Sequence, residues 1–212
     1  MQPDPSEAFL RAIGACAREL TLFRGFDRML AQTQSHTNLI ARSTWEQRWD
    51  RHYRDSAQLF PLIPARTRRL LDIGSGAGFP GIPLAILALQ RAPQLHLHLA
   101  ESVGKKARFL EEVATSLPLA NVTVLNERID ARGGAHEFDL ITARAVTALP
   151  DLLALAAPRL ARGGCLLFPK GRRAQEELDA AAKQWSFSIT ATASETDPQA
   201  RILAIRELKR RR

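Results

Sequence analysis

The chain has 212 residues, a formal net charge of +8 and 45% hydrophobic residues. This length is enough for one globular domain with a sizeable core and a terminal extension. No apolar run reaches the roughly 20 residues that span a bilayer, and the first residues do not resemble a secretory signal. Two cysteines, Cys16 and Cys165, are too few for a disulfide framework. We therefore expect a cytoplasmic protein with reduced thiols and no membrane partner.

The positive charge comes mainly from arginine, which binds phosphate groups in a bidentate manner better than lysine does. A basic surface on a small α/β enzyme favours a polyanionic partner, most simply nucleic acid. A genome whose codons favour arginine would give the same composition. Both interpretations remain open at this point.

Residues 1–64 predict a helical extension that packs on the main domain. Apolar residues recur at helical spacing over residues 6–34. A second helix is expected from Thr44, acting as its N-cap, to about Leu59. Within it, Arg51 is a candidate RNA contact in a segment over the active site, and a solvated helix face is the alternative.

Residues 65–212 predict an α/β domain. Short apolar runs alternate with helical segments of about a dozen residues, which is typical of βαβ units and a parallel sheet. The expected strands are 69–73, 95–100, 122–125, 138–142, 164–168, 186–192 and 201–207. The expected helices are 80–91, 104–116, 149–161 and 172–184. The segment between the last two strands is too short for a helix, so these strands should pair antiparallel. This outline is the class I S-adenosylmethionine-dependent methyltransferase fold, a Rossmann-like seven-stranded sheet whose last strand is antiparallel.

The glycine-rich loop after the first expected strand is the candidate cofactor site. A strand, a glycine turn and a helix place a ligand at the carboxyl end of the strand, where glycine lets the ligand approach the main chain. Gly74, Gly76 and Gly78 form G-x-G-x-G, and Phe79 stands where a dinucleotide fingerprint has its third glycine. The Asp72 carboxylate is unfavourable beside a pyrophosphate but favourable beside an ammonium or a sulfonium. The loop therefore predicts S-adenosylmethionine, with a merely connecting turn as the alternative.

Acidic residues after the next two strands are candidates to bind adenosine. Glu101 ends the second expected strand, where a carboxylate can accept both ribose hydroxyls. The alternative is an acid favoured by the dipole of the following helix. After the third strand, Ile129 would cover the adenine ring, and its N–H and the Asp130 carboxylate would bind the ring edge. An ordinary loop is the alternative there.

Basic residues at the same edge of the sheet are candidates to act on the substrate. Arg144 follows the fourth strand and is the candidate catalytic residue, since it would orient the methionine end of the cofactor or hold the target base. A structural ion-pair residue is the alternative. Lys170 follows the fifth strand and is a candidate RNA contact. Further candidate RNA contacts are Lys105, Lys106 and Arg108.

Absent motifs narrow the reaction. The chain lacks the Asn-Pro-Pro-aromatic and Asp-Pro-Pro-aromatic runs of amino-group methylation and a Pro-Cys pair for attack on a pyrimidine carbon. The remaining targets include guanine N7, which has a free lone pair and lies beside O6, the acceptor pair that arginine recognises. Catalysis would then depend on alignment and electrostatic stabilisation, without a dedicated base. No metal is expected.

Six segments together form a more specific pattern. They are Asn38-Leu39-Ile40, Arg51-His52 followed by Asp55-Ser56, the loop from Asp72 to Pro83, Gly104-Lys105-Lys106 with Arg108-Phe109-Leu110, Arg144-Ala145, and Lys170-Gly171. This set resembles the RsmG (GidB) family of small-subunit ribosomal RNA guanine-N7 methyltransferases.

The resemblance implies methyl transfer from S-adenosylmethionine to N7 of a guanine in the 530 loop of 16S rRNA. It implies cofactor contacts at Gly74, Phe79, Ile129, Asp130 and Arg144. The expected partner is 16S rRNA or a precursor of the 30S subunit, with no obligatory protein partner. Two alternatives remain: an enzyme of the same fold that acts on another RNA such as tRNA, and an RNA-binding module with an inactive cofactor pocket.

Overall fold

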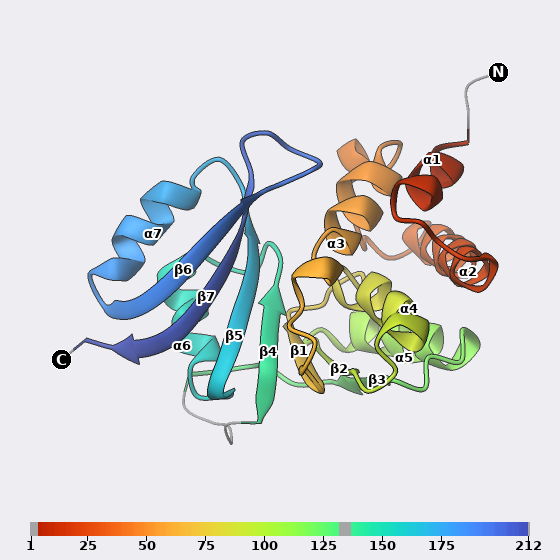
Figure 1. The fold of residues 1–212 in the computed structure, drawn as a ribbon. Coiled ribbons are helices and arrows are strands. Elements are labelled where there is room, and N and C mark those ends of the chain that lie inside the picture. Colours follow the sequence, from red (N-terminus) through yellow and green to blue (C-terminus); the bar gives the residue numbers. More distant parts are fainter. Residues whose placement is uncertain (1–3, 132–136, 212) are drawn as a thin grey trace.

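A seven-stranded sheet forms the centre of the protein in a computed structural model that describes residues 4–131 and 137–211. The strand order is β3-β2-β1-β4-β5-β7-β6. The strands are β1 (Arg69–Ile73), β2 (His96–Ala100), β3 (Val122–Leu125), β4 (Phe138–Ala143), β5 (Leu160–Lys170), β6 (Trp185–Ala193) and β7 (Arg201–Arg210). Strands β1 to β5 pair in parallel, whereas β7 is antiparallel to both β5 and β6 (Figure 1).

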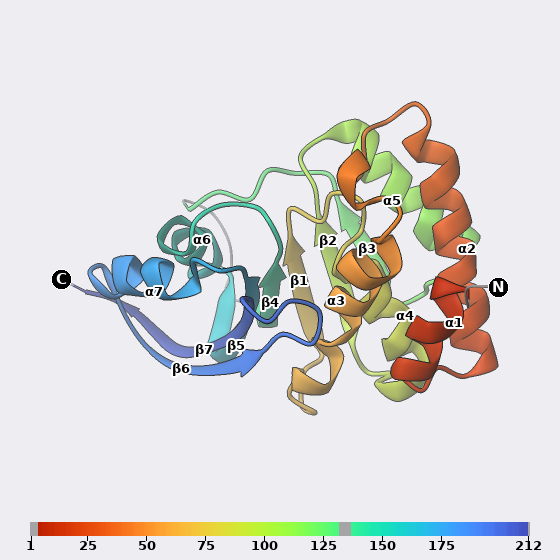
Figure 2. The same cartoon turned by 90° about the horizontal axis from the view of Figure 1, so that it is seen from above.

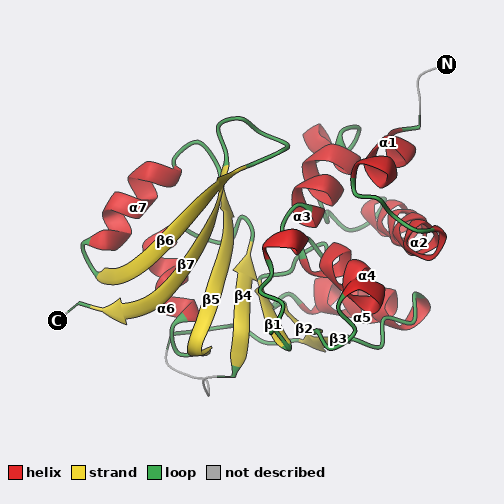
Figure 3. Ribbon diagram, viewed as in Figure 1, coloured by secondary structure: helices red, strands yellow, loops and turns green. Residues whose placement is uncertain are grey.

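Helices cover the sheet from both sides (Figures 2 and 3). Helices α4 (Gly81–Arg91) and α5 (Gly104–Ser116) lie on one face, next to β1, β2 and β3. Helices α6 (Leu149–Ala156) and α7 (Ala174–Ala182) lie on the other face. Because both faces of β1 and β4 are covered, these strands are almost entirely buried and read as continuous apolar runs rather than as alternating patterns.

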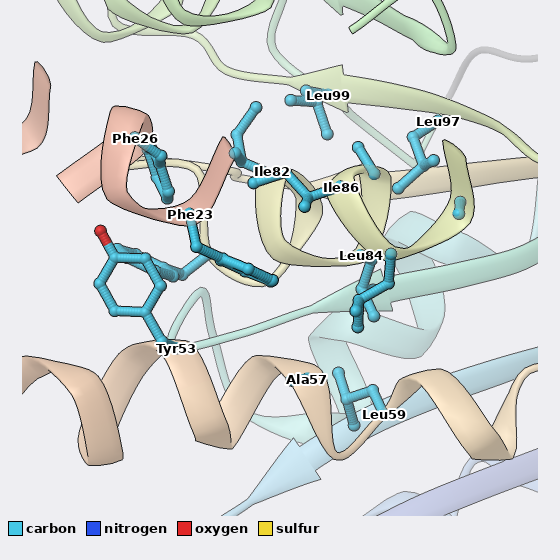
Figure 4. Close-up of a cluster of buried hydrophobic side chains, with 14 of the residues drawn as sticks. Phe23, Phe26, Tyr53, Ala57, Leu59, Ile82, Leu84, Ile86, Leu97 and Leu99 are labelled. Carbon is cyan, nitrogen blue, oxygen red and sulfur yellow. The ribbon is translucent and has the colours of Figure 1, made fainter. Parts of the chain in front are cut away.

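The N-terminal segment packs directly on α4 and shares one hydrophobic core with it. Figure 4 shows Phe23 and Phe26 of α2 (Ala17–Gln34) beside Tyr53, close to Ile82 of α4. Tyr53, Phe23 and Phe26 are fully buried. The division of the chain into an extension over residues 1–64 and a domain from residue 65 stays a prediction.

The single helix predicted over residues 6–34 was wrong. The chain forms α1 (Pro5–Ala12) and α2, separated by a turn in which Gly14 has φ of +59°. Helix α2 then begins with a capping box, in which the Cys16 thiol accepts from the Glu19 N–H and the Glu19 carboxylate accepts from the Cys16 N–H. The apolar spacing continues across this turn, so periodicity alone concealed the break.

The second predicted helix was also wrong in its form. The segment contains η1 (Arg42–Thr44), the π-helix η2 (Trp49–Arg54), α3 (Asp55–Ala57) and η3 (Phe60–Leu62). Thr44 caps no helix, because its hydroxyl donates to the carbonyl oxygen of Ala41 at 2.9 Å.

The other predicted elements are confirmed, with shifts at their ends. Helix α6 stops at Ala156 rather than at residue 161, because Leu160 already pairs with Phe138 at the start of β5. Strands β6 and β7 form the expected antiparallel hairpin. None of the described helices has the length and apolarity required to cross a bilayer.

Candidate active site

A cleft lies at the carboxyl edge of the sheet, where β1 and β4 end. One cavity of about 670 Å³ is lined by the glycine loop, by the N-terminal segment and by the loop between β6 and β7. A second cavity of about 730 Å³ is lined by Ala100, Ile129 and Asp130. Both cavities are lined by Gly74 and Val146, so they adjoin at these residues. The strand order reverses between β1 and β4, the place where open α/β sheets bind their ligands.

The glycine loop leaves room for a ligand against its main chain. Gly74, Gly76 and Gly78 all have positive φ, at +67°, +56° and +93°. A Cβ on Gly74 would lie 2.8 Å from a methyl group of Val146, whereas a Cβ on Gly76 would meet only the Gly74 carbonyl oxygen, at 3.7 Å. Gly76 lines the cleft, so a side chain there would take space from a bound molecule. This arrangement fits a cofactor that lies directly on the loop.

Asp72 lies beneath the loop rather than on the cleft wall. Its side chain is fully buried, and its Oδ2 accepts from the Gly81 N–H at 3.2 Å. Its Oδ1 has no hydrogen-bond partner among the described residues. Burial raises the pKa of Asp72 to about 7, although the Ser75 and Gly81 hydrogen bonds and the nearby Arg144 guanidinium favour its charged form. The carboxylate holds the start of α4 under the loop, and its contact with the cofactor stays a prediction.

Glu101 joins the glycine loop to the start of α5. One carboxylate oxygen accepts from the Gly76 N–H at 2.9 Å and the other from the Val103 N–H at 2.7 Å. The side chain lines the cleft although it is only 6% exposed. Each carboxylate oxygen can accept a second hydrogen bond, so the geometry is compatible with both the ribose role and the helix-start role.

Ile129 and Asp130 line the second cavity, beyond the end of β3. The structure therefore brings them to one cleft with Gly74, as an adenine site would require. Their contacts with the adenine ring remain predictions. Phe79, in contrast, is 4% exposed and lines the first cavity, where its ring lies 5.3 Å from the Arg144 guanidinium carbon.

Arg144 lines the first cavity and is bound by the N-terminal segment. Its NH1 donates to the Arg51 carbonyl oxygen at 3.0 Å and to Asp55 Oδ2 at 3.3 Å, and its NH2 lies 2.9 Å from His52 Nδ1. The ion pair that the alternative, structural interpretation of Arg144 requires is thus present. A guanidinium has five N–H donors, and these contacts leave donors that can reach a ligand in the cavity.

His52 connects Arg144 to the cavity rim. Because arginine only donates, Nδ1 of His52 must accept, and Nε2 therefore carries the proton and donates to Thr44 Oγ1 at 2.9 Å. Burial and the neighbouring guanidiniums of Arg144 and Arg51 lower the pKa of His52 to about 4. The ring is therefore neutral at pH 7.

The residues that residue-by-residue reasoning missed are Asp55, Gln58 and Thr196. Asp55 Oδ1 accepts from the Thr196 hydroxyl at 2.8 Å and from Gln58 Nε2 at 2.9 Å. The Gln58 side-chain oxygen also accepts from the Glu195 N–H at 2.8 Å. These contacts fasten the β6–β7 loop to the N-terminal segment. The Arg51-His52-x-x-Asp55 spacing was a usable signal for part of this network, since it places the three residues on one helical turn.

The candidate RNA contacts differ in how accessible they are. Lys105 and Arg108 are exposed on α5, and Lys106 is half-buried at the cleft. Arg51 is half-exposed, with a guanidinium nitrogen 3.8 Å from Asp197. Lys170 is instead held inside the protein, where its Nζ donates to Thr147 O at 3.0 Å and to Glu177 at 2.8 Å. Lys170 thus anchors the loop after β4, and its contact with RNA stays a prediction.

Comparison with known proteins identifies the family. The family model described as GidB, rRNA small subunit methyltransferase G, matches residues 19–201. The chain belongs to this family. It is 44% identical to the ribosomal RNA small subunit methyltransferase G of Paramagnetospirillum magneticum over 97% of both chains. It is 42% identical to the protein of the same name from Rhodospirillum centenum, over 94% of this chain and 89% of that relative.

Solved structures share the fold at low sequence identity. A predicted O-methyltransferase from Agrobacterium tumefaciens has a TM-score of 0.57 at 20% identity, over 74% of this chain and 81% of that one. An O-methyltransferase from Bacillus cereus in complex with SAH has a TM-score of 0.55 at 14% identity, over 86% and 91% of the two chains. The expected class I methyltransferase fold is confirmed.

Proposed function

We propose that this protein transfers a methyl group from S-adenosylmethionine to N7 of a guanine in the 530 loop of 16S rRNA. The observation that carries the proposal is the family match over residues 19–201, which includes both walls of the cleft. The substrate is then 16S rRNA or a 30S precursor, and the protein acts in the cytoplasm.

The cleft offers a place for each of the three parts of the cofactor: the adenine, the ribose and the methionyl part. The adenine would lie between Ile129 and Asp130 in the second cavity, and the ribose hydroxyls would reach the Glu101 carboxylate. The methionyl part would lie on the main chain at Gly74 and Gly76, in the first cavity. When bound, S-adenosylmethionine supplies a methyl group on a positively charged sulfur.

The residues around Arg144 suit a reaction without a general base. Guanine N7 carries a lone pair and needs no deprotonation before attack, so alignment of the reacting atoms provides most of the catalysis. Arg144 is fixed by Asp55 and His52, and its remaining N–H groups can donate to guanine O6 or to the cofactor carboxylate. Both ring nitrogens of His52 are already hydrogen-bonded, one to Arg144 and the other to Thr44, which makes His52 a positioning residue.

Calorimetry and a labelling assay test this proposal. The protein should bind S-adenosylmethionine and transfer labelled methyl groups to 16S rRNA or to 30S particles from cells that lack the gene. Comparison of free 16S rRNA with 30S particles would identify the form that is the substrate. A stronger signal on tRNA would select the other-RNA alternative, and absence of cofactor binding would select the inactive RNA-binding module.

A further inference from the structure

Three arginines from separate parts of the chain meet at the opposite edge of the sheet from the cleft. Arg66 precedes β1, Arg162 lies near the start of β5, and Arg206 lies in the middle of β7. Together with Asp139 they line a cavity of about 190 Å³. Asp139 is the second residue of β4, so this cavity lies at the amino ends of the parallel strands.

The positive charge in this cavity is not neutralised by the protein. Within residues 4–131 and 137–211, none of these arginines is ion-paired with a carboxylate. Arg66 donates only to a carbonyl oxygen, that of Gly163, at 3.2 Å. Asp139 directs its Oδ2 to the backbone N–H groups of Arg68 and Arg69, at 2.8 and 3.0 Å. Three guanidiniums and one carboxylate leave a net positive cavity of a kind that suits a phosphate group.

The face of β7 and β6 opposite to α6 and α7 connects this cavity to the cleft. On this face Ile202 of β7 is buried, whereas the side chains of β6 are exposed. Helices α6 and α7 cover one face of β5, β7 and β6, whereas none of the helices in the described part of the chain lies over the other face of these strands (Figures 1 and 2). Residues alternate along a strand, and Ile202 and Ala204 of β7 pack on the side opposite to α6 and α7. Arg206 continues this series. Ile202 lines the cleft and Arg206 lines the arginine cavity, so at about 3.3 Å per residue the two sites are only about 13 Å apart along β7.

The neighbouring edge strand adds hydroxyl groups to the same face. The pairing of β6 with β7 places Thr192, Thr190 and Ser188 opposite Ile202, Ala204 and Arg206, respectively. All three β6 side chains are exposed. Hydroxyl groups and arginines are typical donors to phosphate and sugar oxygens of a nucleic acid. The face therefore offers a neutral polar path that ends in a positive cavity.

We propose that Arg66, Arg162 and Arg206 bind a phosphate of the RNA strand that leaves the cleft along the exposed side chains of β6. The proposal rests on RNA being the substrate, as inferred above. The ligand is a phosphodiester of the RNA rather than a free anion. This site is separate from Lys105, Lys106 and Arg108, which lie beside the cleft on α5.

The salt dependence of RNA binding tests the proposal. The triple variant R66Q/R162Q/R206Q is compared with R11Q/R18Q/R28Q, a matched control that removes three exposed arginines from α1 and α2. The probe is a 16S rRNA fragment that contains the 530 loop, titrated at several NaCl concentrations. Three phosphate contacts at a slope of about 0.7 each should lower the slope of log K against log[NaCl] by about 2, and should weaken binding at 0.15 M NaCl roughly 50-fold.

Two further readouts separate this site from the catalytic one. The triple variant should bind S-adenosylmethionine as the wild type does and should raise KM for RNA without lowering kcat. If it does not fold, R162Q alone serves, because Arg162 is exposed and its loss should lower the slope by about 0.7. An unchanged slope, or a drop no larger than that of the control, would overturn the proposal.

A titration with inorganic phosphate distinguishes the two sources of the anion. Phosphate binding that is lost in the triple variant, combined with an unchanged RNA salt slope, would assign a free-anion site and refute the RNA path. A wild type that methylates no RNA would refute the proposed function. A wild type that methylates 16S rRNA while the triple variant keeps its RNA affinity would refute only the phosphate site.

Discussion

Replacement of Gly76 by alanine tests whether the cofactor lies on the glycine loop. Gly76 has φ of +56°, and a Cβ there would meet no atom closer than 3.7 Å, so the new methyl group would extend into the cleft. Gly14 offers a matched control. It has φ of +59°, nothing within 4 Å of its Cβ position, and no place on the cleft wall. The two substitutions should therefore strain the backbone equally and differ only in what the methyl group meets.

The expected magnitudes follow from this comparison. Alanine in the left-handed region costs about 1–2 kcal/mol, so both variants should lose about that much unfolding free energy. For a chain of this size, the loss corresponds to a fall in Tm of roughly 2–8 °C. A methyl group forced against a close-packed ligand costs a further 1–3 kcal/mol or so, which is roughly a 5- to 150-fold weaker affinity. Only Gly76→Ala should show this weakening.

Thermal unfolding and calorimetry with S-adenosylmethionine measure the two effects separately. We expect similar Tm values for the two variants, and weakened cofactor binding for Gly76→Ala alone. Unchanged cofactor affinity in Gly76→Ala would show that nothing binds against this part of the loop. An equal loss of cofactor affinity in Gly14→Ala would show that the weaker binding results from general destabilisation of the protein.

The remaining predictions concern Arg144, His52 and the basic start of α5. Arg144→Ala should abolish methyl transfer and lower the unfolding free energy by about 3 kcal/mol, because Asp55 loses its charge partner. The double variant R144A/D55N removes the unpaired charge but keeps an oxygen that can accept from Thr196 and Gln58, so it should regain stability in chemical denaturation but not activity; recovery of activity would reduce Arg144 to a structural role. Burial and neighbouring guanidiniums lower the pKa of His52 from 6.5 to about 4, so its contribution to stability is present above pH 6.5 and is lost as the pH falls from 6.5 to 4. Between pH 7 and pH 5, chemical denaturation should show a smaller loss of unfolding free energy in His52→Asn than in the wild type. An equal loss in the two proteins would contradict the assignment of a neutral His52 ring. Replacement of Lys105, Lys106 and Arg108 on α5 by glutamine should weaken RNA binding and reduce its dependence on salt concentration. An unchanged salt dependence would show that the RNA does not contact this part of α5.

The order and type of the sheet elements could be predicted because their signals are local. Apolar runs gave the seven strands, and the short connection after Ala193 required an antiparallel hairpin. The helices of the N-terminal segment were harder to predict, because Gly14 interrupts an apolar pattern that continues in phase on both sides. The π-helix η2 could not be predicted from periodicity, since its form depends on tertiary contacts, such as the packing of Phe9 in α1 against Trp49 with ring centroids 5.5 Å apart.

The candidate site could be predicted where residues follow the carboxyl ends of strands. Sheet topology brings Gly74, Glu101 and Arg144 to one cleft whatever the details of the loops. The partners of Arg144 could not be derived in this way, because Asp55 lies 89 residues before it and meets it only after the N-terminal segment has packed. Lys170 shows the reverse: its position at the carboxyl end of β5 suggested a contact with RNA, but Glu177, one helical turn into α7, binds it.

Mapping the methylated atom tests the central claim most directly. Small-subunit particles from cells that lack the gene would be incubated with the protein and S-adenosylmethionine, and the 16S rRNA would be digested and sequenced by mass spectrometry. The account predicts one added methyl group, at N7 of a single guanine in the 530 loop, with wild-type protein and none with Arg144→Ala. A methyl group on another atom or another region of the RNA, or an unmodified 530 loop after cofactor binding has been demonstrated, would contradict it.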